Sequence, residues 1–335
     1  MLIMKKESIS LMLVITAVIA ICAGASYWAF LHVMEAETNA RYVGLQNTIS
    51  AKVEKTINVM ETNAKNVFDE VGESLSSPDA VIEALKRKTE FAPDVRGYFA
   101  AFEPEYFKEK GRWFEPYVHR SADSDGYKLS MVGSARHDYT KSSWYVSAKK
   151  KKGGFWSDPY YYYDGSEISG HYCTYVEPVY DADGKLVCVC GADMTFSWLT
   201  DELKRIDSQY KDNEALNRYR VMRDLDFYSV IVDKDGSSIV YPGVKKVSVK
   251  DNEILKSMAE KKRGVLQMPI DGVPSTLYYG PIEGMDWTLM VITPTQDIEK
   301  PKLYVGVMLL MVVVLGIFAA WVICRRIRYA EDKQV

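Results

Sequence analysis

Residues 170–193 read GHYCTYVEPVYDADGKLVCVCGAD and carry the clearest indication of fold in the chain. Two runs rich in aromatic and β-branched residues flank the sequence DADG at 181–184. An Asp-Gly pair between alternating runs is a strong signal for a β-hairpin. The stretch therefore predicts two antiparallel strands joined by a tight turn.

The pairing that this turn favours also assigns side chains to the two faces of the hairpin. If Tyr180 pairs with Lys185, then Tyr172 lies opposite Asp193, and Thr174 shares their face. The other face takes Tyr175, Cys173, Cys188 and Cys190. No two of these cysteines are directly opposed in that register, so we expect buried free thiols rather than a disulfide.

Similar short runs divided by Gly, Asp and Pro surround this hairpin on both sides. They indicate strands at 95–102, 117–120 and 127–131, with a helix at 141–152. Further along the chain the hairpin pattern repeats around DKDG at 233–236. These runs predict an α+β fold with two compact modules.

A long amphipathic helix is expected ahead of both modules. Apolar residues recur in steps of three and four, which is the spacing of one helix face. They are Leu45, Ile49, Val53, Ile57, Met60, Ala64, Val67, Val71 and Leu75. Such a stripe usually packs against the domain behind it. Pro78 and Asp79 then indicate the start of a second, shorter helix that runs through Lys88.

Two runs without a charged residue bracket the modules, at 9–31 and 303–324. They contain 23 and 22 residues, and about 20 suffice for a helix to span a bilayer. Lys5 and Lys6 precede the first run, and three arginines follow the second within residues 325–328. The positive-inside rule then places both termini in the cytoplasm and the modules outside a bacterial-type plasma (inner) membrane.

Two other interpretations of the first run remain open. The small residues at 23–25 could be the cleavage site of a signal peptide, and the run could instead be a buried core helix. The apolar core of a signal peptide is usually about 7 to 15 residues long, and this run continues through Trp28 and Leu31. We therefore favour an uncleaved membrane anchor.

Composition and motifs argue against several classes of protein. The formal net charge of −3 gives no footprint for nucleic-acid binding. The sequence has no Gly-rich phosphate loop, nucleophile elbow, His-Glu-x-x-His or Cys-x-x-Cys motif. We therefore expect no enzyme activity, no cofactor and no metal site.

A binding surface is indicated instead by tyrosines and one carboxylate. Residues 160–163 are four consecutive tyrosines, and alternation along a strand would direct two of them to each face. Two could then line a cavity with rings and hydroxyl groups. Asp193 ends the apolar strand 186–192, where a carboxylate is costly unless it is paired. Both features point to a pocket for a small molecule.

An ordered set of short motifs resembles the double Cache (PAS-like) sensor family, found in chemoreceptors and sensor histidine kinases. The motifs are GYFAAFEP at 97–104, WY at 144–145, WSDPY at 156–160, TY at 174–175, GAD at 191–193, VDKDG at 232–236 and GMDWT at 284–288. The resemblance implies two PAS-like Cache modules on a long N-terminal helix, flanked by two transmembrane helices.

The expected domain boundaries follow from the runs and the resemblance together. They are 1–8 for a cytoplasmic N-terminus, 9–31 for the first span, 32–94 for the stalk helix and short helix, 95–198 for the membrane-distal module, 199–300 for the membrane-proximal module, 303–324 for the second span and 325–335 for a cytoplasmic tail.

The resemblance implies a receptor that binds an amino acid, an organic acid or an amine in the distal module. In members that bind amino acids, a Tyr and an Arg before the Trp-Tyr pair hold the carboxylate, and later Asp residues hold the ammonium. Here Ser142 stands in the place of that Arg, with Lys141 beside it. The candidate ligand-binding residues are Tyr139, Lys141, Trp144, Tyr145, Tyr160, Tyr162, Asp164, Tyr172 and Asp193.

The signalling output is expected to lie outside this sequence. The eleven residues at 325–335 are too few for a kinase, cyclase or methyl-accepting domain. We therefore expect a sensor that acts through a homodimer, a separate membrane partner or an output domain missing from the chain. The alternative is a passive binding or adhesion module that its spans only tether.

Overall fold

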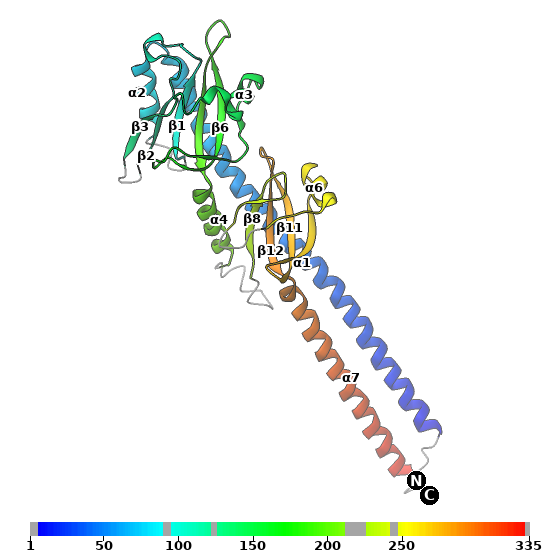
Figure 1. Ribbon diagram of the computed structural model, residues 1–335. Helices are drawn as coiled ribbons and strands as arrows, with labels where there is room; N and C mark the ends of the chain where they lie inside the picture. Colours follow the sequence, from blue (N-terminus) through cyan, green and yellow to red (C-terminus); the bar gives the residue numbers. More distant parts are fainter. Residues whose placement is uncertain (1–5, 90–94, 122–125, 212–225, 242–246, 332–335) are drawn as a thin grey trace.

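A single long helix organises the molecule along its whole length (Figure 1). The computed structural model describes residues 6–89, 95–121, 126–211, 226–241 and 247–331. Helix α1, Lys6–Glu73, contains 68 residues, and two modules are stacked along its C-terminal half. Helix α7, Thr295–Glu331, lies beside the N-terminal half of α1, so the start of α1 and the end of α7 lie close together.

The predicted apolar stripe of α1 is confirmed. The side chains of Ile49, Val53, Ile57, Met60, Ala64, Val67 and Val71 are buried, and those of Leu45 and Leu75 are partly buried. Because the stripe is continuous, α1 packs against both modules with the same face. Helix α2, Pro78–Thr89, follows and begins at the proline that the sequence indicated.

The distal module is built on a seven-stranded antiparallel sheet. The order is β3-β2-β1-β7-β6-β4, and β5 also pairs with β6. The strands are β1 Gly97–Phe102, β2 Pro116–Arg120, β3 Tyr127–Met131, β4 Phe155–Trp156, β5 Tyr160–Tyr162, β6 Gly170–Tyr180 and β7 Leu186–Thr195. Two short 3-10 helices, η1 Lys108–Lys110 and η2 Tyr139–Lys141, and helix α3, Ser143–Lys150, lie between strands.

The predicted hairpin forms as β6 and β7, but its predicted register is wrong by two residues. Tyr180 pairs with Leu186 instead of Lys185, and an irregularity between Val179 and Tyr180 adds a second residue of shift. Thr174 therefore lies opposite Asp193. Because a shift of two residues restores the same alternation, Tyr172, Asp193 and the three cysteines stay on their predicted faces.

The two faces of the distal sheet have different partners. Cys173, Cys188 and Cys190 are free thiols on the face that packs against α1, as the alternation predicted. The other face carries Phe99 and Val176 and packs against α3. The distal sheet is thus a single layer, with α1 on one face and α3 on the other.

The proximal module is a five-stranded antiparallel sheet in the order β10-β11-β12-β8-β9. Helix α4, Phe196–Lys211, connects it to the distal sheet, and the order along the chain is then β8 Tyr228–Val232, β9 Ser238–Val240, α6 Asn252–Ala259, β10 Gly264–Ile270, β11 Val273–Ile282 and β12 Trp287–Pro294. Strand β12 runs directly into α7. This arrangement confirms an α+β fold with two antiparallel sheets and a long N-terminal helix.

Residues 10–73 and 295–326 are helices long and apolar enough, by length and composition, to cross a membrane. They contain the expected spans, 9–31 and 303–324, apart from residue 9 at the start of the first. The two helices pack side by side, and the Tyr27 hydroxyl donates a hydrogen bond of 3.3 Å to the Lys302 carbonyl. Within the two expected spans taken together, most large apolar side chains are exposed, as lipid-facing side chains are.

Candidate ligand-binding site

A cavity of about 40 Å³ lies on the face of the distal sheet that points away from α1. Five of the residues proposed from the sequence line it: Trp144, Tyr160, Tyr162, Tyr172 and Asp193. Six further residues complete the lining: Phe99, Glu115, Tyr117, Val132, His137 and Ile168. The cavity therefore combines aromatic walls with two carboxyl groups.

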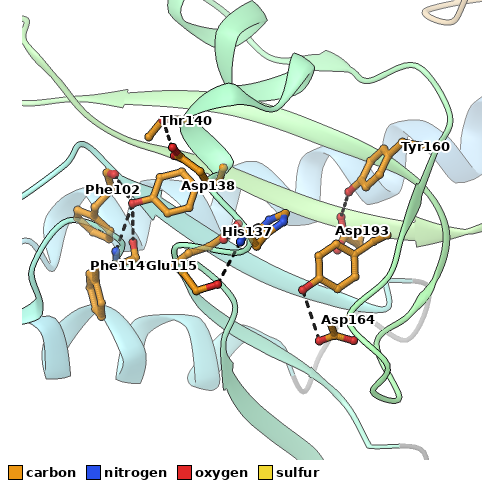
Figure 2. A network of polar contacts seen from close by, with 12 residues as sticks. Phe102, Phe114, Glu115, His137, Asp138, Thr140, Tyr160, Asp164 and Asp193 are labelled. Carbon is orange, nitrogen blue, oxygen red and sulfur yellow. Dashed lines mark hydrogen bonds and ion pairs between the residues drawn. The ribbon is translucent and has the colours of Figure 1, made fainter.

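Asp193 lies near the end of β7, and only 6% of its surface is exposed. The Thr174 hydroxyl donates to Asp193 Oδ1 over 2.6 Å from the opposite position on β6. The Tyr160 hydroxyl lies 2.7 Å from Thr174 Oγ1 and 3.4 Å from the same carboxylate oxygen (Figure 2). Because Thr174 gives its proton to Asp193, Tyr160 is the donor to Thr174, and the three groups form a chain.

Burial raises the pKa of Asp193 to about 6, although neighbouring hydroxyl groups favour its ionised form. These are the hydroxyls of Thr174, Tyr117 and Tyr160. The Tyr117 hydroxyl is close enough to act on the charge of Asp193 but makes no hydrogen bond of acceptable geometry. At neutral pH the carboxyl is therefore ionised but retains an affinity for protons or other cations.

Glu115 is the main residue that sequence reasoning missed. It immediately precedes β2, only 3% of it is exposed, and its Oε2 atom has no hydrogen-bond partner. His137 Nε2 lies 3.7 Å from that oxygen, which is too long for a hydrogen bond (Figure 2). Burial, and then the charge of Asp193, raise the pKa of Glu115 well above its usual value. Burial also lowers the pKa of His137, so its imidazole does not provide a positive charge beside Glu115 at neutral pH.

The run of tyrosines alternates as predicted. Tyr160 and Tyr162 line the cavity, whereas Tyr161 and Tyr163 are 57% and 73% exposed. Tyr172 joins them from β6, and its hydroxyl donates to the Ile168 carbonyl over 2.7 Å. The rings form the cavity wall, and alternation along β5 explains which of the four tyrosines contribute.

Four other residues proposed from the sequence lie outside the cavity lining. The first two are core side chains. Tyr139 is fully buried, and its hydroxyl donates to the Phe102 carbonyl over 2.7 Å. The Tyr145 hydroxyl donates to Glu103 Oε1 over 2.7 Å. Both hydroxyls are therefore committed to the protein itself.

The other two, Lys141 and Asp164, lie at the surface. The Lys141 side chain is 81% exposed and pairs with Asp138 at 3.4 Å, because the short helix η2 turns it toward solvent. Asp164 is exposed and accepts hydrogen bonds from the Ser166 amide, at 2.8 Å, and the Ser169 hydroxyl, at 3.0 Å. It stabilises its own loop and touches the cavity wall through the Tyr162 hydroxyl at 3.4 Å.

A sequence signal for Glu115 does exist. The run WFEPYVH at 113–119 places one carboxylate between aromatic residues, which is the signal that identified Asp193. His137 lies in a polar segment and has no comparable signal. Within the described residues, no three His, Cys, Asp or Glu side chains are placed to hold a metal ion.

Comparison with known proteins finds one family whose model matches the distal module. Residues 81–201 match the family described as "Methyl-accepting chemotaxis protein-like, first PDC sensor domain". No curated protein matches the sequence significantly.

Solved structures share the fold over most of the chain at low sequence identity. The periplasmic sensory domain of the Campylobacter jejuni chemoreceptor Tlp1 has a TM-score of 0.60 and 16% identity, covering 80% of this chain and 99% of that one. The extracellular domain of the putative histidine kinase soHK1S-Z6 gives 0.56 and 19%, covering 81% and 99%. The ligand-binding domain of the Pseudomonas fluorescens chemoreceptor CtaA, in complex with L-isoleucine, gives 0.53 and 13%, covering 80% and 97%. Residues 81–201 therefore match a PDC sensor domain, and the chain shares its fold with extracellular sensor domains of chemoreceptors and histidine kinases.

Proposed function

We propose that this protein is a membrane-anchored extracytoplasmic sensor that binds a small molecule in the cavity around Asp193. The observation that carries the proposal is the cavity itself, in which a buried carboxylate oxygen of Glu115 has no hydrogen-bond donor. A buried polar atom without a partner destabilises a fold by about 1–3 kcal/mol. A ligand that supplies the missing donor removes this penalty, so the bound state is favoured.

Membrane anchoring is the second part of the proposal. The spans are residues 9–31 and 303–324, both termini are cytoplasmic, and the two modules face the outside of a bacterial-type inner membrane. The exposed apolar side chains of α1 and α7 and the basic residues that flank the two apolar runs support this arrangement. The membrane then covers the apolar surface that both helices leave open.

The signal is proposed to pass from the cavity to α1 through β6. The Thr174 hydroxyl donates to Asp193, which lines the cavity, while the next residue, Tyr175, faces α1. The Tyr175 ring stacks on Phe68 of α1 with ring centroids 6.2 Å apart. A second contact joins β4 to α1, where Trp156 Nε1 donates to Glu61 Oε1 over 2.7 Å. Ligand binding that shifts β6 would therefore move α1, which continues into the first span.

The partner is proposed to be a second copy of the chain or a separate membrane protein that senses movement of α1 and α7. The CtaA domain is bound to L-isoleucine, and the Tlp3 domain of Campylobacter jejuni is bound to 4-methylisoleucine. An amino acid, an organic acid and an amine are the ligand classes to screen first for this chain.

The test is a thermal-shift screen of the full chain in lipid nanodiscs against these three classes. A ligand that binds the folded state raises the melting temperature by mass action. We expect a hit that Asp193→Asn abolishes. The exposed neighbour Tyr161, changed to Phe, serves as the matched control and should leave the shift intact.

A second readout separates a sensor from a passive binding module. Fusing α7 to the output domain of a histidine kinase should give kinase activity that changes when the hit is added. Binding without any change in kinase activity would support the adhesion or tethering alternative. A hit that survives Asp193→Asn would move the binding site away from this cavity.

A further inference from the structure

The charges around the cavity restrict the class of ligand, and this inference rests on the proposed function. Two carboxyl groups, Glu115 and Asp193, line the cavity, and no lysine or arginine is among the described lining residues. Lys141 points into solvent. Arg96 lines a different cleft and donates to the Glu167 carbonyl over 3.1 Å. The histidine in the lining, His137, is held uncharged by burial.

A ligand carboxylate would find little to bind in this cavity. It would approach Asp193, which is ionised at neutral pH, and would face Glu115 across the same space. Like charges in one buried site repel each other, and no lysine or arginine among the described lining residues offsets that repulsion. An organic acid, and the carboxylate end of an amino acid, are therefore disfavoured.

A ligand with a cationic N–H donor matches the polar atoms of the cavity that have no hydrogen-bond partner. Glu115 Oε2 lacks a donor, and the Tyr117 hydroxyl is buried without a hydrogen-bond partner. An ammonium group has two or three N–H bonds and can reach several acceptors at once. The positive charge would also compensate Asp193, whose carboxylate is buried with hydroxyl partners alone.

The walls of the cavity fit the same ligand class. Phe99, Trp144 and Tyr160 contribute ring surface, and Tyr162 and Tyr172 extend it. Aromatic faces attract organic cations, and the attraction strengthens where water is excluded. The cavity has a volume of about 40 Å³. One water molecule needs about 10–15 Å³ measured in the same way, so the cavity has room for an ammonium group with a short substituent.

We propose that the cavity binds a small primary or secondary ammonium ion, and that Glu115 acts with Asp193 as the carboxyl that selects it. Asp193 supplies the negative charge, Glu115 accepts an N–H bond, and the aromatic walls enclose the substituent. The absence of lysine and arginine from the described lining residues is what disfavours the carboxylate-bearing classes.

The test is isothermal titration calorimetry with the full chain in nanodiscs at pH 7.5. The probes are ethylammonium, alanine, propionate and tetramethylammonium, which separate charge, carboxylate and N–H donation. We expect ethylammonium to bind most tightly, tetramethylammonium and alanine more weakly, and propionate not at all. Glu115→Gln should weaken ethylammonium binding by about tenfold or more, the value of one charge-assisted hydrogen bond.

Glu177→Gln is the matched control. It changes a partly buried glutamate of β6, whose neighbour Tyr175 faces α1, and Glu177 does not line the cavity. It should leave ethylammonium binding unchanged, and the melting temperature of each variant shows whether it is folded. If Glu115→Gln fails to fold, the order of the four probes on the unmodified chain still decides the ligand class.

The outcomes separate this inference from the proposed function. Propionate or alanine binding more tightly than ethylammonium, and depending on Asp193, would overturn the ammonium inference and leave the sensor proposal standing. A folded Glu115→Gln variant that binds ethylammonium normally would remove Glu115 from the site. If ethylammonium fails to bind while the wider screen yields a different class of ligand, the inference fails alone. If the screen also yields none, the proposed function fails with it.

Discussion

Asp193 and Asp207 are both buried and both have a pKa raised to about 6, but their carboxylates have different hydrogen-bond partners. Asp207 on α4 accepts from the Ser229 amide over 2.7 Å and from the Ser229 hydroxyl over 2.6 Å, one bond to each carboxylate oxygen. Asp193 has both hydroxyl contacts on Oδ1 and a neighbouring acid, Glu115, whose Oε2 lacks a donor. Asp207 joins α4 to β8, whereas Asp193 faces a cavity.

The two sheets differ in the same way on the face that points away from α1. In the proximal module, Val230, Leu277 and Met290 fill this face with apolar side chains. The Tyr279 hydroxyl there lies 3.0 Å from the Ser257 hydroxyl of α6 and is satisfied. In the distal module, polar atoms on the equivalent face remain unsatisfied. Burial and a raised pKa therefore do not identify a binding site, whereas unsatisfied neighbours around a cavity do.

The largest expected effect is the dependence of stability on pH. Both aspartates have a folded pKa of about 6 against an ordinary value of 3.8, so the folded state binds their protons more tightly. Their contribution to stability is therefore greatest near pH 4 and is lost as the pH rises through 6, by at most about 3 kcal/mol for each group.

Melting temperatures of the full chain between pH 4.5 and 7.5 test whether stability falls as the pH rises. Asp193→Asn and Asp207→Asn should each remove part of the decline that the unmodified chain shows toward neutral pH. An ammonium ligand should remove only the part that belongs to Asp193, because the bound cation favours the ionised carboxylate. Equal responses of both aspartates to the ligand would contradict the comparison.

The next largest effect is the loss of the hydrogen bonds by which Asp207 joins α4 to β8. Asp207→Ala leaves the Ser229 amide and hydroxyl without their acceptor and should lower the free energy of unfolding by about 3 kcal/mol. Asp193→Ala should lower it by less than about 1 kcal/mol, because it also relieves the repulsion between Asp193 and Glu115. Thermal denaturation at pH 7.5 measures both. Similar losses would show that Asp193, too, is primarily a structural residue.

A glycine on β7 offers a smaller, steric test of the cavity. Gly191 pairs with Phe99, and a Cβ atom at position 191 would overlap the Phe99 ring. Gly191→Ala should push the ring toward the cavity, lower stability by about 1–3 kcal/mol and weaken ligand binding. Gly153→Ala adds a Cβ atom with no neighbour within 4 Å and should change neither quantity. Normal ligand affinity in Gly191→Ala would place the binding site elsewhere.

The smallest effect separates neighbouring tyrosines. Tyr160→Phe removes the donor to Thr174 and should weaken ligand binding several-fold, corresponding to about 1 kcal/mol. Tyr161→Phe changes an exposed ring and should have no measurable effect. Calorimetric titration of both variants gives the difference. Equal affinities would mean that the hydroxyl chain to Asp193 does not contribute to the site.

The sequence predicted those features that local periodicity determines. The stripe of α1, the β6–β7 hairpin and the alternation of Tyr160 with Tyr161 each depend on side chains a few residues apart. The hairpin register was predicted wrongly because the turn and the irregularity between Val179 and Tyr180 each shift the pairing by one residue, which alternation alone does not reveal.

The candidate site was predicted only in part because it is assembled from distant segments. Glu115 and His137 reach the cavity through the packing of β2 and the loop before η2, which sequence spacing does not specify. Tyr139 and Lys141 were placed in the site by family resemblance. In this chain, the turn that contains them directs one into the core and the other into solvent.

The length of α1 has a mechanical consequence. A straight helix rises 1.5 Å per residue, so the part of α1 between residue 44 and residue 6 forms a lever arm of about 57 Å. A displacement of Phe68 along the helix axis would move the N-terminal end of α1 by the same distance. A tilt of α1 about the proximal module would instead move that end sideways by about 1 Å per degree. A cavity with room for only a few atoms could thus produce movement of molecular size at the opposite end of the chain.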